Sequence, residues 1–280
     1  MKNAGKNVIF IFTFLYINAC YTPRYVYSPP TQNIPGLNRK NDIELAANYG
    51  SSLNIFPRKN NYSRGFDLHT AWAFSKHFGI MLNENARWER NTTNDSFFPA
   101  DSSSLSYKRN FTEAGIGYFT PLRNNTKMQF QVFSGAAFGS SGIWDDFFSN
   151  GSYTKKYHQS AVTKIFIQPA FIFIPTKDFA AALSSRFTKV SFSNIRTNYT
   201  ASEQNNYLLD SLTVHPIFFW EPALTYTFGF KKFPVKVRLQ GSISVLLNHR
   251  FVEHRSSNIG LGLVSDFSPH HSKLKEVPKN

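Results

Sequence analysis

The chain has 280 residues, with 31 Lys and Arg against 17 Asp and Glu, a formal net charge of +14 and one cysteine. A single cysteine excludes an internal disulfide framework, and the length beyond the N-terminal region suits one domain. Aromatic residues make up 16% of the chain, although its mean hydropathy is −0.32. Many aromatic residues at modest hydropathy favour strands that are apolar on one face only.

Residues 1–19 predict a secretory signal peptide. Lys2 and Lys6 are the only charges before residue 20, and the apolar run VIFIFTFLYI follows them. A membrane-spanning helix needs roughly 20 apolar residues, so this run is too short to span a bilayer. A basic start, a short apolar core and small residues at its end are typical of an export signal. A buried N-terminal strand or helix is the alternative.

The only cysteine directly follows this run, in the sequence Ile17-Asn18-Ala19-Cys20. The tetrapeptide resembles the bacterial lipobox, with Asn18 an untypical occupant of its second position. The resemblance implies cleavage before Cys20 and acylation of its thiol, whereas an ordinary signal with an incidental cysteine is the alternative. Residues 20–41 contain four prolines and few aliphatic residues. They are predicted to form an extended, Pro-rich tether.

Residues 42–267 alternate between apolar and polar side chains. In the segment that starts at Gly65, Phe66 and Trp72 fall on one face, and Asp67 and His69 fall on the other. Successive side chains of a strand point to opposite faces, so the pattern predicts strands with one aromatic face and one small or polar face. About ten strands are expected, at roughly 42–50, 62–75, 78–89, 108–120, 127–139, 159–173, 179–191, 213–229, 234–246 and 257–267.

The connections between these segments alternate in length. Those after the even-numbered strands are short, such as KH and FKKF, and the others are long, such as residues 140–158. Outer-membrane barrels alternate tight periplasmic turns with long extracellular loops. The fold is therefore predicted to be all-β, an antiparallel up-and-down transmembrane β-barrel. Both termini are expected in the periplasm, with a polar tail at 268–280.

A soluble lipocalin-like or sandwich domain on a lipid anchor is the alternative architecture. It would place the aromatic face inside and the polar face in water. The polar face repeatedly holds Glu, Lys, Arg and Gln beside Gly and Ala, and the aromatic groups are very bulky for a core. We therefore expect the aromatic face to meet lipid. Glu84 is an exception, because it falls on the lipid side of the third strand.

With its INAC tetrapeptide, its PRYVYSPP tether and its one-sided strands, the chain resembles the small outer-membrane β-barrel lipoproteins of Gram-negative bacteria. The closing segment GLVSDF, residues 262–267, resembles the barrel-assembly signal, although Ser265 stands where that signal prefers an apolar residue. The resemblance covers the whole chain. It implies an outer-membrane location, a covalent lipid on Cys20 and recognition by the barrel-assembly machinery, but it implies no reaction.

The inward faces are predicted to carry a network of charges in the lumen. A ten-stranded barrel is narrow, and buried charges need partners. The expected function is therefore a non-enzymatic structural or surface protein with a charge-plugged lumen, and a narrow pore for small solutes is the alternative. The predicted members of the network are Glu44, Asp67, Glu113, Lys164, Arg186, Glu221, Lys236 and Arg238.

A hydrolytic site near the outer rim is a further alternative. Asp67 and His69 share a face with Ser75. Neighbours on one face of a strand lie roughly 7 Å apart, too far for the direct contacts of a catalytic triad. No catalytic residue, cofactor or metal site is expected, since His270 and His271 in the polar tail are weak metal ligands.

The positive charge points to anionic membrane partners. For an exported membrane protein, we expect lipid headgroups and lipopolysaccharide phosphates as partners, and no nucleic acid. The basic and aromatic segment SYTKKYH, residues 152–158, falls in an expected outer loop. Lys155 and Lys156 there are candidates for contact with an unknown extracellular ligand, and a solvated loop is the alternative.

Overall fold

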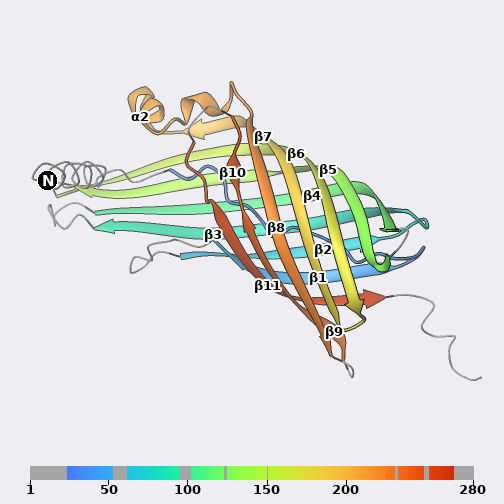
Figure 1. Cartoon of the computed structure of the whole chain (residues 1–280). Helices are drawn as coiled ribbons and strands as arrows, with labels where there is room; N and C mark the ends of the chain where they lie inside the picture. The colour runs from blue at the N-terminus through green and yellow to red at the C-terminus, as the bar shows by residue number, and fades with distance from the viewer. Residues whose placement is uncertain are drawn as a thin grey trace, which may run out of the picture.

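The computed structural model describes residues 24–52, 62–94, 102–122, 125–149, 151–230, 233–248 and 252–267. The predicted signal peptide, Cys20 and the tail 268–280 lie outside these ranges. The described residues form one closed ring of antiparallel strands (Figure 1).

Ten long strands follow one another around the ring. β1 pairs with both β2 and β11, and β9 pairs with both β8 and β11, which closes the barrel. A two-residue strand, β10 (Val245–Leu246), adds to β8, and the short helices α2 (Ala201–Asn206) and η1 (Asp210–Leu212) lie between β7 and β8. The ten strands are β1 (Ile43–Ser51), β2 (Tyr62–Trp72), β3 (Phe78–Asn94), β4 (Ser102–Leu122), β5 (Asn125–Ser149), β6 (Ser152–Thr176), β7 (Phe179–Thr197), β8 (Ile217–Phe230), β9 (Phe233–Ile243) and β11 (Ser257–Phe267).

The predicted all-β barrel is confirmed, but several expected loops are shorter than predicted. β3 continues to Asn94, β4 begins at Ser102 and β7 continues to Thr197. β5 and β6 are 25 residues long each and continue through residues 140–149 and 152–158, which were expected to be loop. Ser149 pairs with Ser152, so two residues connect the strands, and Gly151 has φ +75°. An Asn-Gly dipeptide favours a two-residue hairpin turn because such a turn needs positive φ. The segment SYTKKYH is therefore strand.

The two faces of the wall have opposite character. On β2, Phe66 and Leu68 are 57% and 56% exposed on the outside, whereas Asp67 and His69, which alternate with them, are 0% and 3% exposed. A soluble barrel would show the reverse, so the outer surface suits hydrocarbon and the interior is polar. No helix among the described residues is long and apolar enough to cross a membrane.

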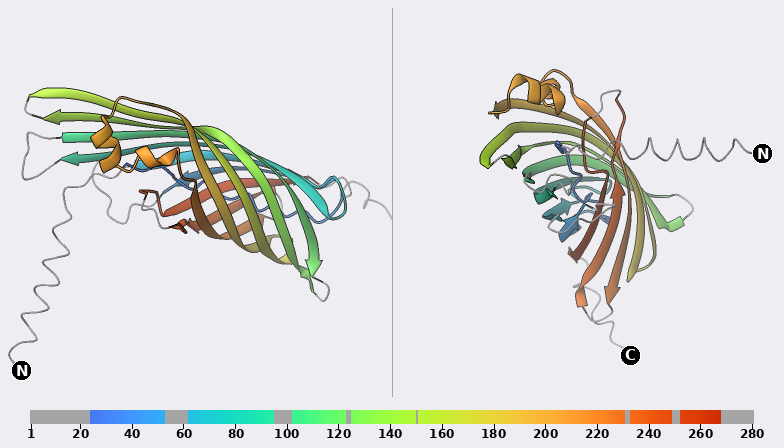
Figure 2. Two further views of the ribbon diagram at one scale, coloured as in Figure 1. Left: turned by 90° about the horizontal axis from the view of Figure 1, so that it is seen from above. Right: turned by 90° about the vertical axis from the view of Figure 1, so that its left-hand side faces the viewer.

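The N-terminal segment runs inside the barrel. Residues 24–37, called the plug segment below, are almost all buried, although they form no named strand. Seen along the barrel, this blue segment lies within the ring of strands (Figure 2, right). The expectation of a free tether therefore differs from the structure over these residues, which are extended but enclosed.

The plug segment enters the lumen from the end that carries the long connections. Arg24 contacts Asp145 and Tyr199 at that end, whereas Leu37 lies beside Gly79 near the short turn between β2 and β3. β11 finishes at Phe267, opposite the first residue of β1 and also at the short-turn end. The two ends of the described chain are thus on opposite sides of the barrel. The expectation that both termini lie in the periplasm concerns residues before 24 and after 267, which lie outside the described ranges.

Candidate functional site

The filled lumen is the candidate functional site, because it gathers most of the buried polar groups. Apolar clusters lie at its two ends. Residues such as Tyr107 and Phe219 pack around Val26 at the long-connection end, and Phe119 and Phe133 pack around Leu37 at the short-turn end. Lys164 and its partner Glu113 lie between these clusters, because on β6 Val162 belongs to the first cluster and Phe166 to the second.

Wall glutamines satisfy the backbone of the plug segment. The Gln32 N–H donates to Gln240 Oε1 (2.5 Å), and Gln240 Nε2 donates back to the Gln32 carbonyl (2.9 Å). Gln168 Nε2 donates to the Asn33 carbonyl (2.7 Å). A buried backbone group without a partner is costly. These side chains therefore supply the main-chain hydrogen bonds that a neighbouring strand would supply in a sheet.

Proline reduces the number of partners that the plug segment needs. Pro29, Pro30 and Pro35 carry no N–H donor, and their fixed φ favours an extended chain without internal hydrogen bonds. The Leu37 carbonyl accepts from Gln129 Nε2 (2.6 Å). The composition that suggested a free tether also suits an extended chain inside a narrow barrel.

Wall carboxylates also hold the plug segment. Asp67 Oδ2 accepts from both the N–H (3.0 Å) and the hydroxyl (2.5 Å) of Thr31. Glu44 Oε2 accepts from the Gly36 N–H (2.8 Å). A hydrogen bond to an ionised acceptor is stronger than a neutral one. Two of the predicted lumen carboxylates thus bind main chain.

A tyrosine fixes the plug segment near the long-connection end. The Tyr27 hydroxyl donates to Glu221 Oε1 (2.9 Å), and its ring stacks on Phe219 with centroids 4.5 Å apart. Tyr27 also forms an isolated parallel bridge with His254 in the connection before β11. Glu221 accepts a second bond from the Thr188 hydroxyl (2.6 Å).

Glu113 is the centre of the main ion cluster. Lys164 Nζ lies 2.6 Å from its Oε1, and Arg186 Nη1 lies 3.2 Å from its Oε2. The three side chains are at most 2% exposed. Asn83 also donates to Glu113 (3.3 Å), and Gln168 Oε1 accepts from Arg186 Nε (2.7 Å). The charges therefore meet the condition that buried ions be both paired and hydrogen-bonded.

Most of the predicted network lies where the sequence pattern places it. Glu113 meets Lys164 and Arg186, and Glu44 meets Arg238 (2.8 Å). Lys236 is the error: it pairs with Asp266, and the two side chains are 31% and 43% exposed, so Lys236 is not part of the buried network. Its strand position is on the inward face, but it lies close to the short-turn rim.

Further charged residues of the lumen were missed. Arg87 and Glu89 continue the inward face of β3, so the same alternation could have revealed them. Arg24 came from a segment without periodicity and offered no such signal. The missed ion pairs are Arg87–Asp67 (2.7 Å), Arg109–Glu89 (2.8 Å), Arg255–Glu89 (3.4 Å) and Arg24–Asp145 (2.5 Å).

The residues weighed for hydrolysis are not brought together. Ser75 accepts backbone N–H bonds within the turn after β2. His69 is buried in the lumen, with its Nε2 3.5 Å from the Thr31 hydroxyl, and Asp67 is paired with Arg87. Within the described ranges, no group of three or more His, Cys, Asp or Glu could hold a metal ion. Asp67 and His69 thus contact Thr31 of the plug segment, whereas Ser75 contacts its own turn.

Comparisons with known proteins add a weak likeness of fold. No family model matches the chain, and no curated protein matches it. Among solved structures, Ail, the attachment invasion locus protein of Yersinia pestis, is 13% identical with a TM-score of 0.32, over 81% of this chain and 99% of that one. An outer membrane channel from Pseudomonas putida F1 is 11% identical with a TM-score of 0.39, over 84% and 100%. The barrel is therefore established by its own strand pairing.

Proposed function

We propose that this chain is a lipid-anchored outer-membrane barrel whose lumen is closed by its own N-terminal segment. It acts as a structural or surface protein rather than an enzyme. The carrying observation is the plug segment, whose main chain is bonded to Gln240, Gln168, Gln129, Asp67 and Glu44 of the wall. Outer-membrane lipids and the barrel-assembly machinery are its expected partners.

The proposed orientation puts the short turns in the periplasm, as in other outer-membrane barrels. The chain before Arg24 then starts from the cell-surface end. Cys20 is four residues earlier in the sequence, and four extended residues reach at most about 14 Å. A lipid on Cys20 would therefore insert in the outer leaflet. Mass spectrometry of the mature chain tests acylation, and an unmodified thiol at Cys20 would remove the anchor from the proposal.

Ion conductance in a planar bilayer tests the closed lumen. We expect the full chain to show no steady current, because both ends of the lumen are packed with apolar side chains. A variant with Gln129, Gln168 and Gln240 replaced by Ala loses the wall donors to the plug segment, and it should show intermittent openings. A steady current from the unmodified chain would instead support the narrow pore.

A further inference from the structure

A row of basic and aromatic side chains crosses the outer face of five neighbouring strand pairs. Cross-strand pairing aligns its members in one line near the long-connection end. Strands lie about 4.8 Å apart, so Lys108 is roughly 10 Å from Arg64 and roughly 14 Å from Arg196 along the row. In order from β2 to β7, the row is Arg64, Trp88, Lys108, Gly142, Gln159 and Arg196.

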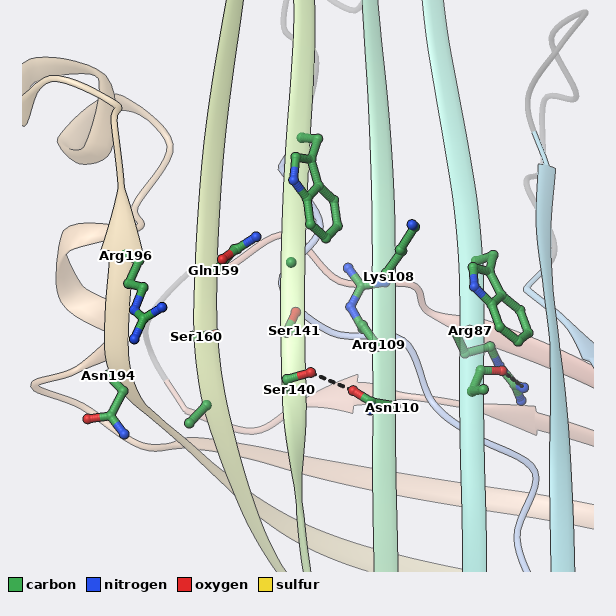
Figure 3. Close-up of a pocket in the computed structure, with 15 residues that line it drawn as sticks. Arg87, Lys108, Arg109, Asn110, Ser140, Ser141, Gln159, Ser160, Asn194 and Arg196 are labelled. Carbon is green, nitrogen blue, oxygen red and sulfur yellow. Dashed lines mark hydrogen bonds between the residues drawn. The ribbon is translucent and has the colours of Figure 1, made fainter.

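This row borders a hollow of about 560 Å³. Figure 3 shows Lys108 on one side of it, Arg196 on the other, and Gln159 between them. Asn110 and Ser140 are hydrogen-bonded to each other in the next row (2.5 Å). Four cations line the hollow, of which Arg87 and Arg109 are paired with Asp67 and Glu89 in the lumen. Lys108 and Arg196 are the two on the outer face.

Gly142 shapes the hollow. The Trp144 indole lies directly against the position that a Cβ on Gly142 would occupy. Because residue 142 has no side chain, the Trp144 ring packs directly against the backbone of β5 there. Lys108 Nζ lies 5.7 Å from the centroid of this ring. Trp88 is 39% exposed on the same face. Exposed tryptophans of a membrane barrel concentrate at the level of the lipid headgroups.

Among the described residues, the cations of this row have no carboxylate partner. Within the described parts of the chain, no carboxylate lies within 4.0 Å of the nitrogens of Arg64, Lys108 or Arg196. The outward carboxylates Glu84 and Asp146 belong to other rows. Toward the short turns, the same face becomes apolar, at Phe138, Leu82, Ile116 and Ile165. A ligand that fits both parts has an anionic head and acyl chains.

We propose that this hollow binds the phosphorylated headgroup of an outer-leaflet lipid, with Lys108 and Arg196 as its phosphate ligands. The acyl chains lie along the apolar band below it. This inference rests on the membrane orientation proposed above, but not on the closed lumen. Conductance reports on the lumen and lipid retention reports on the outer face, so failure of one is distinguishable from failure of the other.

Lipid retention by the purified full chain, counted by native mass spectrometry, tests the site. The probes are diphosphoryl lipid A, its dephosphorylated form and phosphatidylcholine. Each cation near an anionic headgroup adds about 1 kcal/mol. The double variant Lys108→Gln, Arg196→Gln should therefore bind diphosphoryl lipid A about 30-fold more weakly. The charge-matched control Lys155→Gln, Lys177→Gln changes exposed cations outside both the row and the apolar band, and it should bind as the unmodified chain does.

Gly142→Ala tests the shape of the hollow without changing charge. The added methyl displaces the Trp144 ring, so retention of lipid A should fall while dephosphorylated lipid and phosphatidylcholine stay weak. Equal loss in the control pair, no loss in the double variant, or equal retention of dephosphorylated lipid A would each overturn the site. A heat-modifiable gel shift, measured for every variant, shows that the barrel is folded.

Discussion

Neutralising Glu113 should destabilise the barrel far more than neutralising an outward carboxylate. Glu113→Gln keeps the size of the side chain but leaves Lys164 and Arg186, both at most 2% exposed, without a counter-ion. Two charge-assisted hydrogen bonds at about 1.5–3 kcal/mol each suggest a loss of about 3–6 kcal/mol. Removing one member of a buried ion cluster costs about 3–5 kcal/mol in other proteins, so the two estimates agree.

Urea unfolding of the refolded barrel in lipid vesicles, followed by tryptophan fluorescence, measures this loss. Glu84→Gln is the matched control, because Glu84 faces outward and pairs with Thr112, the neighbour of Glu113. Adding Lys164→Met to Glu113→Gln removes one orphaned cation and should restore part of the stability. If Glu113→Gln and Glu84→Gln cost the same, the lumen solvates its charges with water, and the reasoning about an occluded interior is wrong.

Three further predictions concern the plug segment and α2. Tyr27→Phe removes the hydroxyl that donates to Glu221, so it should lower the free energy of unfolding by about 1.5–3 kcal/mol. Tyr153→Phe on the outer face is the control and should leave the free energy of unfolding in urea unchanged. The Ser28 and Ser52 hydroxyl oxygens are 3.0 Å apart, so the double variant Ser28→Cys, Ser52→Cys should form a disulfide on oxidation. Peptide mass mapping in a Cys20→Ala background detects this bond. Persistent free thiols would contradict the enclosed position of residue 28. Burial raises the pKa of Glu203, but hydrogen bonds from Lys156 and Thr200 outweigh it and hold the pKa below its usual value. This carboxylate therefore stabilises the docked α2 above pH about 4.5 and loses that contribution as the pH falls through its lowered pKa. Hydrogen-exchange protection factors at residues 201–206, which are relative to the intrinsic exchange rate, should fall in acid, and Glu203→Gln should abolish that pH dependence.

The wall of the barrel was predictable because its constraint repeats every second residue. Lipid on one side and a polar interior on the other produce the same alternation of apolar and polar side chains in every strand. This alternation placed Glu113, Lys164 and Arg186 on the inward face. It also carried the signal for Arg87 and Glu89, which continue the inward face of β3. Lys236 shows its limit, since alternation indicates which face a side chain lies on but not how close it is to the rim.

The plug segment was not predictable in the same way. An extended chain held by side chains from all around a ring has no fixed period, and its partners lie far away in sequence, as Gln240 does from Gln32. Proline suits a free tether and an enclosed chain equally well. The hairpin between β5 and β6 is different, because the sequence does carry its signal: the Asn-Gly dipeptide at 150–151 favours a two-residue turn within the segment that was expected to be loop.

The enclosed residues constrain how the molecule can be built. They continue directly into β1, and β1 forms one side of the seam with β11. A polypeptide cannot pass sideways through a hydrogen-bonded wall. The plug segment must therefore be in place before β1 and β11 pair. Otherwise it would have to thread lengthwise through the closed barrel, past the side chains packed at its ends. Placing the plug segment before the barrel closes is the easier route. The N-terminal residues then act as a template around which the strands assemble.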